Sequence, residues 1–409
     1  MACHDEPGLM SLEDCRARLL ASVALLAAET RVSLDQAAGR VLAQPLQAAL
    51  EAPPADQSAM DGYALHGDDL AGCPGAPRVL RVAGTSLAGH PWPGTLQAGS
   101  CVRIMTGAVV PAGAAAVVMQ EDVQREDDVV VLPRTLRPGE NIRPRGEDTR
   151  VGDALLPAGR RLSAADIGLL ASQGLTEVPV RERLRVALLS TGDELVSPGL
   201  PLAAGQIHDS NRPMLQAALA GAGFEVIDLG HVRDDRDALR ARFLEASRSA
   251  QAVITTGGVS VGEADLVRQV VGELGHVGVW RIAIKPGKPF AFGELAGTAF
   301  FGLPGNPVSA LVTWRQLALP ALLRLQGATW QPPLRVPAHL LAPVRKKPGR
   351  AEFQRGVLAW TADGDMTVTP LAAQGSGLLT SLSQGNAFLV LPRDGGDLPA
   401  GATVLVEPY

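Results

Sequence analysis

The sequence predicts a multidomain protein built around an α/β unit with a parallel-rich sheet, with β-rich units before and after it. Its 409 residues exceed the roughly 250–300 at which a single hydrophobic core stops growing. Buried apolar runs at 184–189, 225–229 and 252–254 alternate with helical patterns at 213–220 and 236–250. Strands and helices that alternate at this spacing are typical of a parallel sheet covered by helices.

A helical and β platform is expected from two separate stretches. Ser11 and Asp14 resemble a capping box, and apolar residues then recur at helical spacing, which predicts an amphipathic helix. A second helix is expected after Ser163, and we expect it to pack on the first one. Residues 1–50 and 145–180 are therefore predicted to form one split unit.

Two further units are expected to be mainly β. Residues 51–144 contain short β-like runs separated by Gly and Pro turns. The α/β unit is predicted over 181–328, and a Pro-rich linker follows it. Alternating apolar and polar runs in 334–409 then predict a small C-terminal β-barrel.

Composition and charge exclude several classes of function. The formal net charge of −5 provides no overall field that attracts nucleic acid, so we expect no nucleic-acid partner. The sequence contains no run of about 18 uncharged apolar residues and no signal-peptide pattern, so no membrane association is expected. The four cysteines lack metal-binding spacing and fit a reducing compartment, which predicts a cytoplasmic protein.

Glycine-containing loops follow several predicted strands of the α/β unit, where open α/β sheets bind ligands. They lie at 188–195, 255–265, 284–290 and 302–309. Gly257 and Gly258 expose backbone N–H groups to an anion, and Asp193 or Glu194, together with Asp265, supplies carboxylates for a metal ion. Neither a P-loop nor a G-x-G-x-x-G spacing is present, so a phosphate site of another geometry is predicted.

The loop at 284–290 carries Lys285 and Lys288 on either side of a Pro-Gly turn. Two ammonium groups that are held together repel each other unless an anion lies between them. This loop therefore predicts a dianion or a polyphosphate as ligand.

Polar loops outside the α/β unit give a weaker signal. Asp61 and Thr106 lie on short loops where ordinary turn residues explain the sequence equally well, and Asp148 lies in a turn crowded with charges. Arg355 and Ser376 lie on predicted turns of the C-terminal unit. The planar fork of an arginine suits a tetrahedral oxyanion, although a solvated surface gives the same pattern.

Ten motifs, taken together and in this order, resemble the molybdopterin molybdenumtransferase family, which comprises the MoeA proteins and the E domains of gephyrin and its plant counterpart. The resemblance extends from about residue 11 to the C-terminus. The motifs are SAMDGYA, RIMTGA, NIRPRGED, STGDEL, DSNRP, TTGGVSVGEAD, IKPGKPFAFG, GLPGNPVS, PGRAEFQRG and QGSG.

The resemblance implies a cytosolic homodimer of elongated subunits, in which the platform dimerises and a MogA-like α/β domain binds molybdopterin. It implies that adenylylated molybdopterin and molybdate are the substrates, that AMP is released, and that Mg²⁺ is the metal. It implies catalytic roles for Asp61, Thr106, Asp148, Glu194, Asp234 and Asp265, with Glu194 and Asp265 as metal ligands; Asp235 is an alternative to Asp234. It implies substrate-binding roles for Gly257, Gly258, Ser260, Lys285, Lys288, Arg355 and Ser376.

Two alternatives to this transferase stay open. The molybdopterin adenylyltransferase acts one step earlier and resembles residues 180–327, but it needs neither the β-rich units nor the Asp61 motif. A non-catalytic dimeric scaffold would not need an intact set of charged loop residues. Our hypothesis is that the α/β loops bind the pterin nucleotide and that the Asp61 and Thr106 loops of a second subunit complete the site. Other proteins of molybdenum cofactor biosynthesis are compatible partners.

Overall fold

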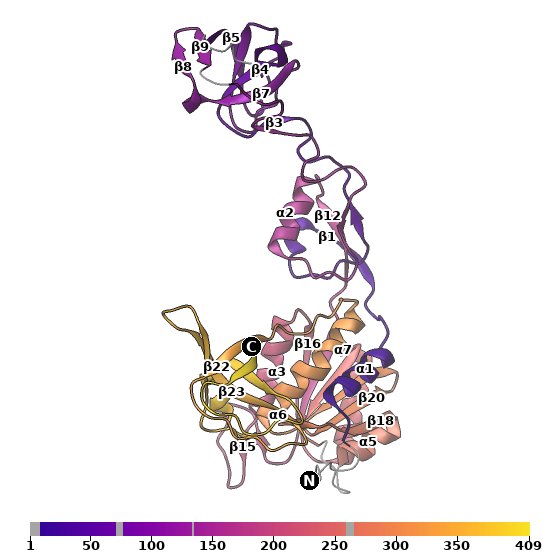
Figure 1. The fold of residues 1–409 in the computed structure, drawn as a ribbon. Helices are drawn as coiled ribbons and strands as arrows, with labels where there is room; N and C mark the ends of the chain where they lie inside the picture. Colours follow the sequence, from indigo (N-terminus) through magenta and orange to yellow (C-terminus); the bar gives the residue numbers. More distant parts are fainter. Residues whose placement is uncertain (1–8, 71–76, 133–134, 259–265) are drawn as a thin grey trace.

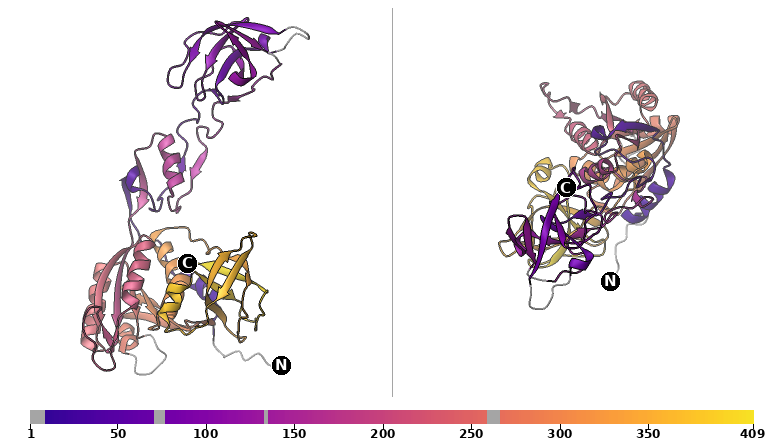
Figure 2. Two further views of the ribbon diagram at one scale, coloured as in Figure 1. Left: turned by 90° about the vertical axis from the view of Figure 1, so that its left-hand side faces the viewer. Right: turned by 90° about the horizontal axis from the view of Figure 1, so that it is seen from above.

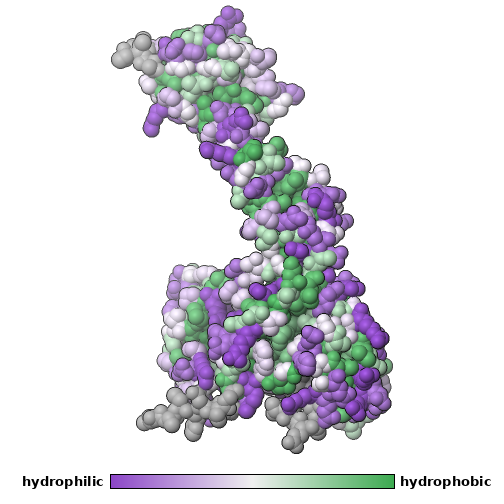
Figure 3. All heavy atoms as spheres, turned by 90° about the vertical axis from the view of Figure 1, so that its right-hand side faces the viewer, coloured by the Kyte–Doolittle hydropathy of each residue, from purple (hydrophilic) through white to green (hydrophobic). Residues whose placement is uncertain are grey.

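The computed structural model describes residues 9–70, 77–132, 135–258 and 266–409. The chain is elongated, with a β-rich unit at one end, a narrow platform in the middle, and an α/β unit beside a β-barrel at the other end (Figure 1). The left view of Figure 2 shows the same succession, and the space-filling view shows the β-rich unit standing clear of the α/β unit (Figure 3). The predicted fold class is confirmed.

The β-rich unit is a six-stranded sheet in the order β7-β4-β6-β5-β9-β8. Its strand β4, next to the edge strand β7, is covered on both faces, because Tyr63 and Leu65 contribute to one core and Ala64 to another. The elements are β3 (Gln57–Ser58), β4 (Gly62–His66), η2 (Gly67–Asp69), β5 (Arg78–Ser86), β6 (Ser100–Ile104), β7 (Ala114–Met119), η3 (Gln120–Asp122), β8 (Gln124–Glu126), β9 (Val129–Leu132) and β10 (Ile142–Arg143).

The platform combines two short antiparallel ladders, β1 with β12 and β2 with β11, and one helix. Ser163 caps that helix through a reciprocal capping box with Asp166, so the predicted helix start is confirmed. The elements are β1 (Glu29–Ser33), η1 (Leu34–Gln36), β2 (Leu46–Gln47), β11 (Ala154–Leu156), α2 (Ala164–Ser172) and β12 (Glu177–Arg181).

The first helix, α1 (Leu12–Ser22), does not belong to this platform core. Its apolar face buries Leu12, Cys15 and Leu19 in the same core as the helices of the α/β unit, and Arg16 Nε donates to the Gln316 carbonyl at 3.0 Å. The expectation that α2 packs on α1 is wrong. An amphipathic pattern shows which residues of a helix are buried but not which partner covers them.

The α/β unit has a mixed sheet in the order β16-β13-β17-β21-β20-β18, parallel across β16, β13, β17 and β21 and antiparallel beyond. Successive residues of β13 serve opposite faces: Leu188 packs in the core beneath α3, α6 and α7, and Leu189 in the core beneath α4 and α5. The strands are β13 (Arg185–Thr191), β16 (Glu225–Val232), β17 (Ala252–Thr256), β18 (Gly275–Arg281), β20 (Pro289–Leu295) and β21 (Thr298–Leu303), with a small ladder of β14 (Leu195–Val196) and β15 (Ile207–His208).

Helices cover both faces of this sheet. They are α3 (Asn211–Gly221), α4 (Arg236–Ser249), α5 (Leu266–Leu274), α6 (Pro307–Thr313) and α7 (Leu319–Gln326), the last two joined by a π turn, η4 (Trp314–Ala318). Within the described ranges, no helix is both long and apolar enough to cross a membrane.

The C-terminal unit is a β-barrel that closes because β23 pairs with both β24 and β25. A strand from the α/β unit, β19, adds to it in parallel with β23, so the two units share a ladder. The elements are β19 (Ile284–Lys285), β22 (Val336–Leu340), β23 (Ala351–Trp360), β24 (Met366–Pro370), α8 (Leu379–Gln384), β25 (Ala387–Leu391) and β26 (Thr403–Pro408).

Candidate active site

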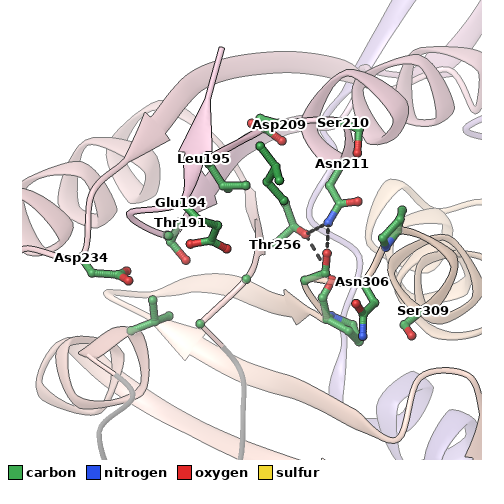
Figure 4. Close-up of a pocket in the computed structure, with 18 of the residues that line it drawn as sticks. Thr191, Glu194, Leu195, Asp209, Ser210, Asn211, Asp234, Thr256, Asn306 and Ser309 are labelled. Atoms are coloured by element: carbon green, nitrogen blue, oxygen red, sulfur yellow. Dashed lines mark hydrogen bonds between the residues drawn. The ribbon is translucent and has the colours of Figure 1, made fainter. Parts of the chain in front are cut away.

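A cavity of about 780 Å³ lies at the carboxyl ends of the parallel strands. The loops after β13, β17 and β21 and the start of α3 form its walls (Figure 4). The side chains divide into two sets: Glu194 and Asp234 lie toward one side, and the hydroxyl and amide groups of Asn211, Asn306 and Ser309 toward the other.

Two glycines bring the loops after β13 and β17 into direct contact. Gly257 has φ +90°, and a Cβ there would lie 2.4 Å from the Thr191 carbonyl oxygen. Gly258 has φ +61°, and a Cβ there would lie 2.3 Å from the Val267 side chain. Any other residue at these positions would strain the backbone and separate the loops. These contacts place the two loops side by side at the strand ends.

Asn211, the first residue of α3, fastens the third loop to the second. Its Nδ2 donates to Thr256 Oγ1 at 2.8 Å and to the Gly305 carbonyl at 2.6 Å, as the dashed lines in Figure 4 show. Thr256 Oγ1 in turn donates to the Pro304 carbonyl at 3.2 Å. The DSNRP motif contributes to the family resemblance, but the sequence did not predict a role for Asn211, because its hydrogen bonds join residues up to 94 positions apart.

The carboxylates of the cavity repel one another. Partial burial raises the pKa of Asp234 above its ordinary value, and the nearby Asp193 and Glu194 carboxylates raise it further. Asp235 does not line the cavity, because its side chain accepts the Ala238 N–H at 2.8 Å as the cap of α4. Of the two residues, Asp234 therefore lines the cavity and Asp235 caps a helix.

The described lining of the cavity carries negative but no positive side chains. Glu194, Asp209 and Asp234 are acidic, and neither a lysine nor an arginine lines the described part of the cavity. Across the described residues, no three His, Cys, Asp or Glu side chains are grouped so that they could hold a metal ion by themselves. A phosphorylated ligand in this cavity therefore needs positive charge from another source.

Neither of the two cavities described in this structure is lined by both lysines of the loop between β19 and β20. Lys285 Nζ lies 3.3 Å from a carboxylate oxygen of Glu352 and faces a second cavity beside the barrel. Lys288 lines neither of these two cavities. Repulsion between the two lysines did not predict the pairing of Lys285 with Glu352, because this carboxylate comes from the barrel, 67 residues later.

Arg355 lies buried beneath a loop of the C-terminal unit. Its side chain is 1% exposed and donates to Ser381 Oγ at 3.0 Å and to the carbonyls of Ala373 and Gly375 at 3.3 and 3.0 Å. Arg355 thus holds this loop in the structure, and its role as an oxyanion ligand stays a prediction. The loop it holds reaches the α/β unit, where the Ser376 carbonyl accepts the Val308 N–H at 3.0 Å, at the first turn of α6.

Asp61 and Thr106 form a compact pair in the β-rich unit. Asp61 Oδ1 accepts the Thr106 N–H at 2.7 Å and the Thr106 hydroxyl at 2.8 Å. The backbone bond first, and then the hydroxyl bond, hold the pKa of Asp61 below its ordinary value. Two residues from motifs 45 positions apart thus meet, but at the end of the molecule opposite the cavity (Figure 1).

Asp148 is exposed where the chain returns from the β-rich unit to the platform, and its N–H donates to the Ala52 carbonyl at 2.9 Å. It does not line the cavity either. Of the remaining predicted residues, Ser260 and Asp265 lie outside the described residues.

Family models match three successive parts of the chain and define its class. Residues 10–174 match the MoeA N-terminal region (domain I and II), and residues 187–324 match a probable molybdopterin binding domain. Residues 337–409 match the MoeA C-terminal region (domain IV). The fold and the cavity thus belong to a protein with a molybdopterin-binding type of α/β domain.

Whole-chain relatives give the particular family. The molybdopterin molybdenumtransferase of Haemophilus influenzae is 42% identical over 98% of this chain and 99% of its own, and molybdopterin molybdenumtransferase 2 of Mycobacterium tuberculosis is 38% identical over 92% and 94%. A molybdopterin biosynthesis MoeA protein from Pyrococcus horikoshii OT3 superposes with a TM-score of 0.84 at 29% identity, over 98% of this chain and 100% of its own. The chain belongs to the MoeA family of molybdopterin molybdenumtransferases, and the resemblance drawn from the motifs is confirmed.

Proposed function

We propose that the protein inserts molybdenum from molybdate into adenylylated molybdopterin and releases AMP. The observation that carries this proposal is the cavity at the strand ends, whose glycine contact and acidic lining suit a phosphorylated pterin with a metal ion. Full-length similarity to proteins named molybdopterin molybdenumtransferase supports it. The volume of about 780 Å³ lies in the range of cofactor-sized ligands.

Mg²⁺ is the metal that this lining fits. Mg²⁺ binds through one or two carboxylates and the phosphates of a substrate, and it does not need a complete protein cage. Glu194 and Asp234 would supply carboxylates, and Asp265, the other predicted ligand, lies outside the described residues. Besides partial burial, repulsion by Asp193 and Glu194 raises the pKa of Asp234, and a divalent cation removes that repulsion. When bound, the ion neutralises charge on the phosphoanhydride that is to be cleaved.

A second copy of the chain would complete the site. Asp61 and Thr106 cannot reach the cavity of their own chain, because the platform separates the two units (Figure 1). In a homodimer with two-fold symmetry, the β-rich unit of one subunit can face the cavity of the other. The bonds from Thr106 keep Asp61 ionised, so it would deliver a negative side chain that accepts hydrogen bonds or helps to hold the metal.

The thiols are consistent with a cytoplasmic location. Cys15 and Cys101 are free and buried, and burial raises the pKa of each to about 12, which keeps them protonated and unreactive. Neither contributes to the cavity, so capture of molybdenum would rest on the dithiolene sulfurs of the substrate.

Incubation of the protein with adenylylated molybdopterin, Mg²⁺ and molybdate tests the proposal. Release of AMP that depends on molybdate is the expected result. Consumption of ATP with molybdopterin would instead identify an adenylyltransferase, and failure to release AMP or consume ATP would favour a scaffold.

A further inference from the structure

A second cavity, of about 610 Å³, lies between β19 and the barrel and is rich in positive charge. We refer to it as the basic cavity. Five cationic and two acidic side chains line it: Lys285, Arg345, Lys346, Lys347, Arg350, Glu352 and Asp397. The basic cavity is therefore the electrostatic opposite of the acidic cavity at the strand ends.

Two of these five cations are already satisfied by the protein. Lys285 pairs with Glu352. Lys346 is 5% exposed, and its ammonium donates to the carbonyls of Lys347, Arg393 and Gly395 at 3.2, 3.1 and 2.8 Å. Lys346 thus forms part of the wall of the basic cavity, and backbone carbonyl groups compensate its positive charge.

The other three cations are not compensated. Within the described parts of the chain, the side chains of Arg345, Lys347 and Arg350 make neither a hydrogen bond nor an ion pair. Like charges gathered around one concavity repel each other, and a bound polyanion removes that repulsion.

The positions of the lysines in the sequence also point to the basic cavity. The sequence contains four lysines among 37 basic residues, which leaves 33 arginines. All four lysines lie between positions 285 and 347, and three of them line the basic cavity. Elsewhere the protein uses arginine for every positive charge, so a compact ammonium with three donors is confined to this region.

We propose that the basic cavity binds a phosphorylated organic anion of nucleotide size. The volume falls within the usual range for small-molecule sites and exceeds what a single tetrahedral oxyanion fills. Three uncompensated cations match several phosphate oxygens, and the exposed carboxylate of Asp397 can accept a hydrogen bond from a hydroxyl or amino group of the same ligand. This site does not depend on the transferase reaction.

The loop from Lys285 to Pro289 gives the site a physical link to the acidic cavity. Lys285 lines the basic cavity, and Pro289, four residues later, lines the acidic one. A ligand that fixes Lys285 therefore acts on a segment that both cavities share.

Lysine acylation of the full-length protein tests the site directly, with ADP as the probe at low ionic strength. Because the chain has four lysines, peptide mass spectrometry follows the reaction of each. ADP is expected to slow acylation of Lys347 and Lys285 more than that of Lys288. Protection of Lys288 alone, or of none, would overturn the proposal. Equal protection of Lys347 by molybdate alone would also overturn it, because a small oxyanion would then be sufficient.

Matched variants measure the same site by calorimetry. The double substitution Arg345→Gln and Lys347→Gln is expected to weaken ADP binding by about tenfold or more, which corresponds to about 1.4 kcal/mol at 25 °C. Arg240→Gln, which removes an exposed arginine on α4, is the control and is expected to change affinity by less than about twofold. Equal affinity in the double variant and the wild type would exclude the basic cavity as the ADP site.

Discussion

Replacement of Arg355 by Met tests whether this residue supports a loop or binds an oxyanion. The methionine stem keeps most of the packing, but it removes the donors that reach Ser381 and the carbonyls of Ala373 and Gly375. Each hydrogen bond to a charged group contributes about 1.5 kcal/mol or more, so loss of the two carbonyl bonds should cost the loop about 3 kcal/mol. Amide exchange in residues 373–382 should then accelerate by about two powers of ten.

Hydrogen–deuterium exchange of the native protein, read by peptide mass spectrometry, measures this effect. Arg240→Met, on an exposed face of α4, is the control and should leave the same peptides unchanged. Molybdate binding, titrated in parallel, distinguishes the two roles. If Arg355→Met abolished molybdate binding while exchange in 373–382 stayed at the wild-type rate, Arg355 would be a direct ligand and the positioning role would be refuted.

Three further predictions concern the acidic cavity at the strand ends and the pair of Asp61 and Thr106. Gly257→Ala should lower the melting temperature more than Gly89→Ala, since both have positive φ but only the Cβ at Gly257 meets the Thr191 carbonyl; equal losses would contradict the close contact. Asp234→Asn should raise the melting temperature at pH 7 and reduce the stabilisation that Mg²⁺ gives. Because the pKa of Asp234 is raised in the folded state, this carboxyl group increases the free energy of unfolding of the wild-type protein as pH falls through the raised pKa toward 3.8. The variant should lack this increase. Thr106→Val removes the hydroxyl bond but keeps the backbone bond, so an NMR titration should show the pKa of Asp61 moved toward its ordinary value but still below it; no change would show that the hydroxyl contributes nothing.

The features that depend on local sequence were predictable. Strand and helix alternation indicated the α/β unit, and the glycines of the 255–265 motif indicated a glycine loop at a strand end, where the structure gives Gly257 and Gly258 positive φ. A backbone with positive φ, or one too close to a neighbour for a Cβ atom, favours glycine, so the residue type itself indicates the local conformation.

The features that depend on distant pairing were not predictable from local patterns. The partner of Lys285 is Glu352, which becomes adjacent only because β19 joins the barrel sheet. Arg355 carries the same guanidinium whether it faces solvent or lies beneath a loop, so its burial could not be seen in the sequence. The pairing of Asp61 with Thr106 had a sequence signal only through the family resemblance of the two motifs.

We propose that two copies of the chain build each active site, and mixed dimers test this shared site. Asp61→Asn and Glu194→Gln subunits, each inactive alone, are combined at equal concentration, and molybdate-dependent AMP release is measured. With random pairing, half of the dimers are mixed and each carries one intact shared site, so activity should return to about a quarter of the wild-type value. No recovered activity, with mixed dimers present by native mass spectrometry, would contradict the shared site.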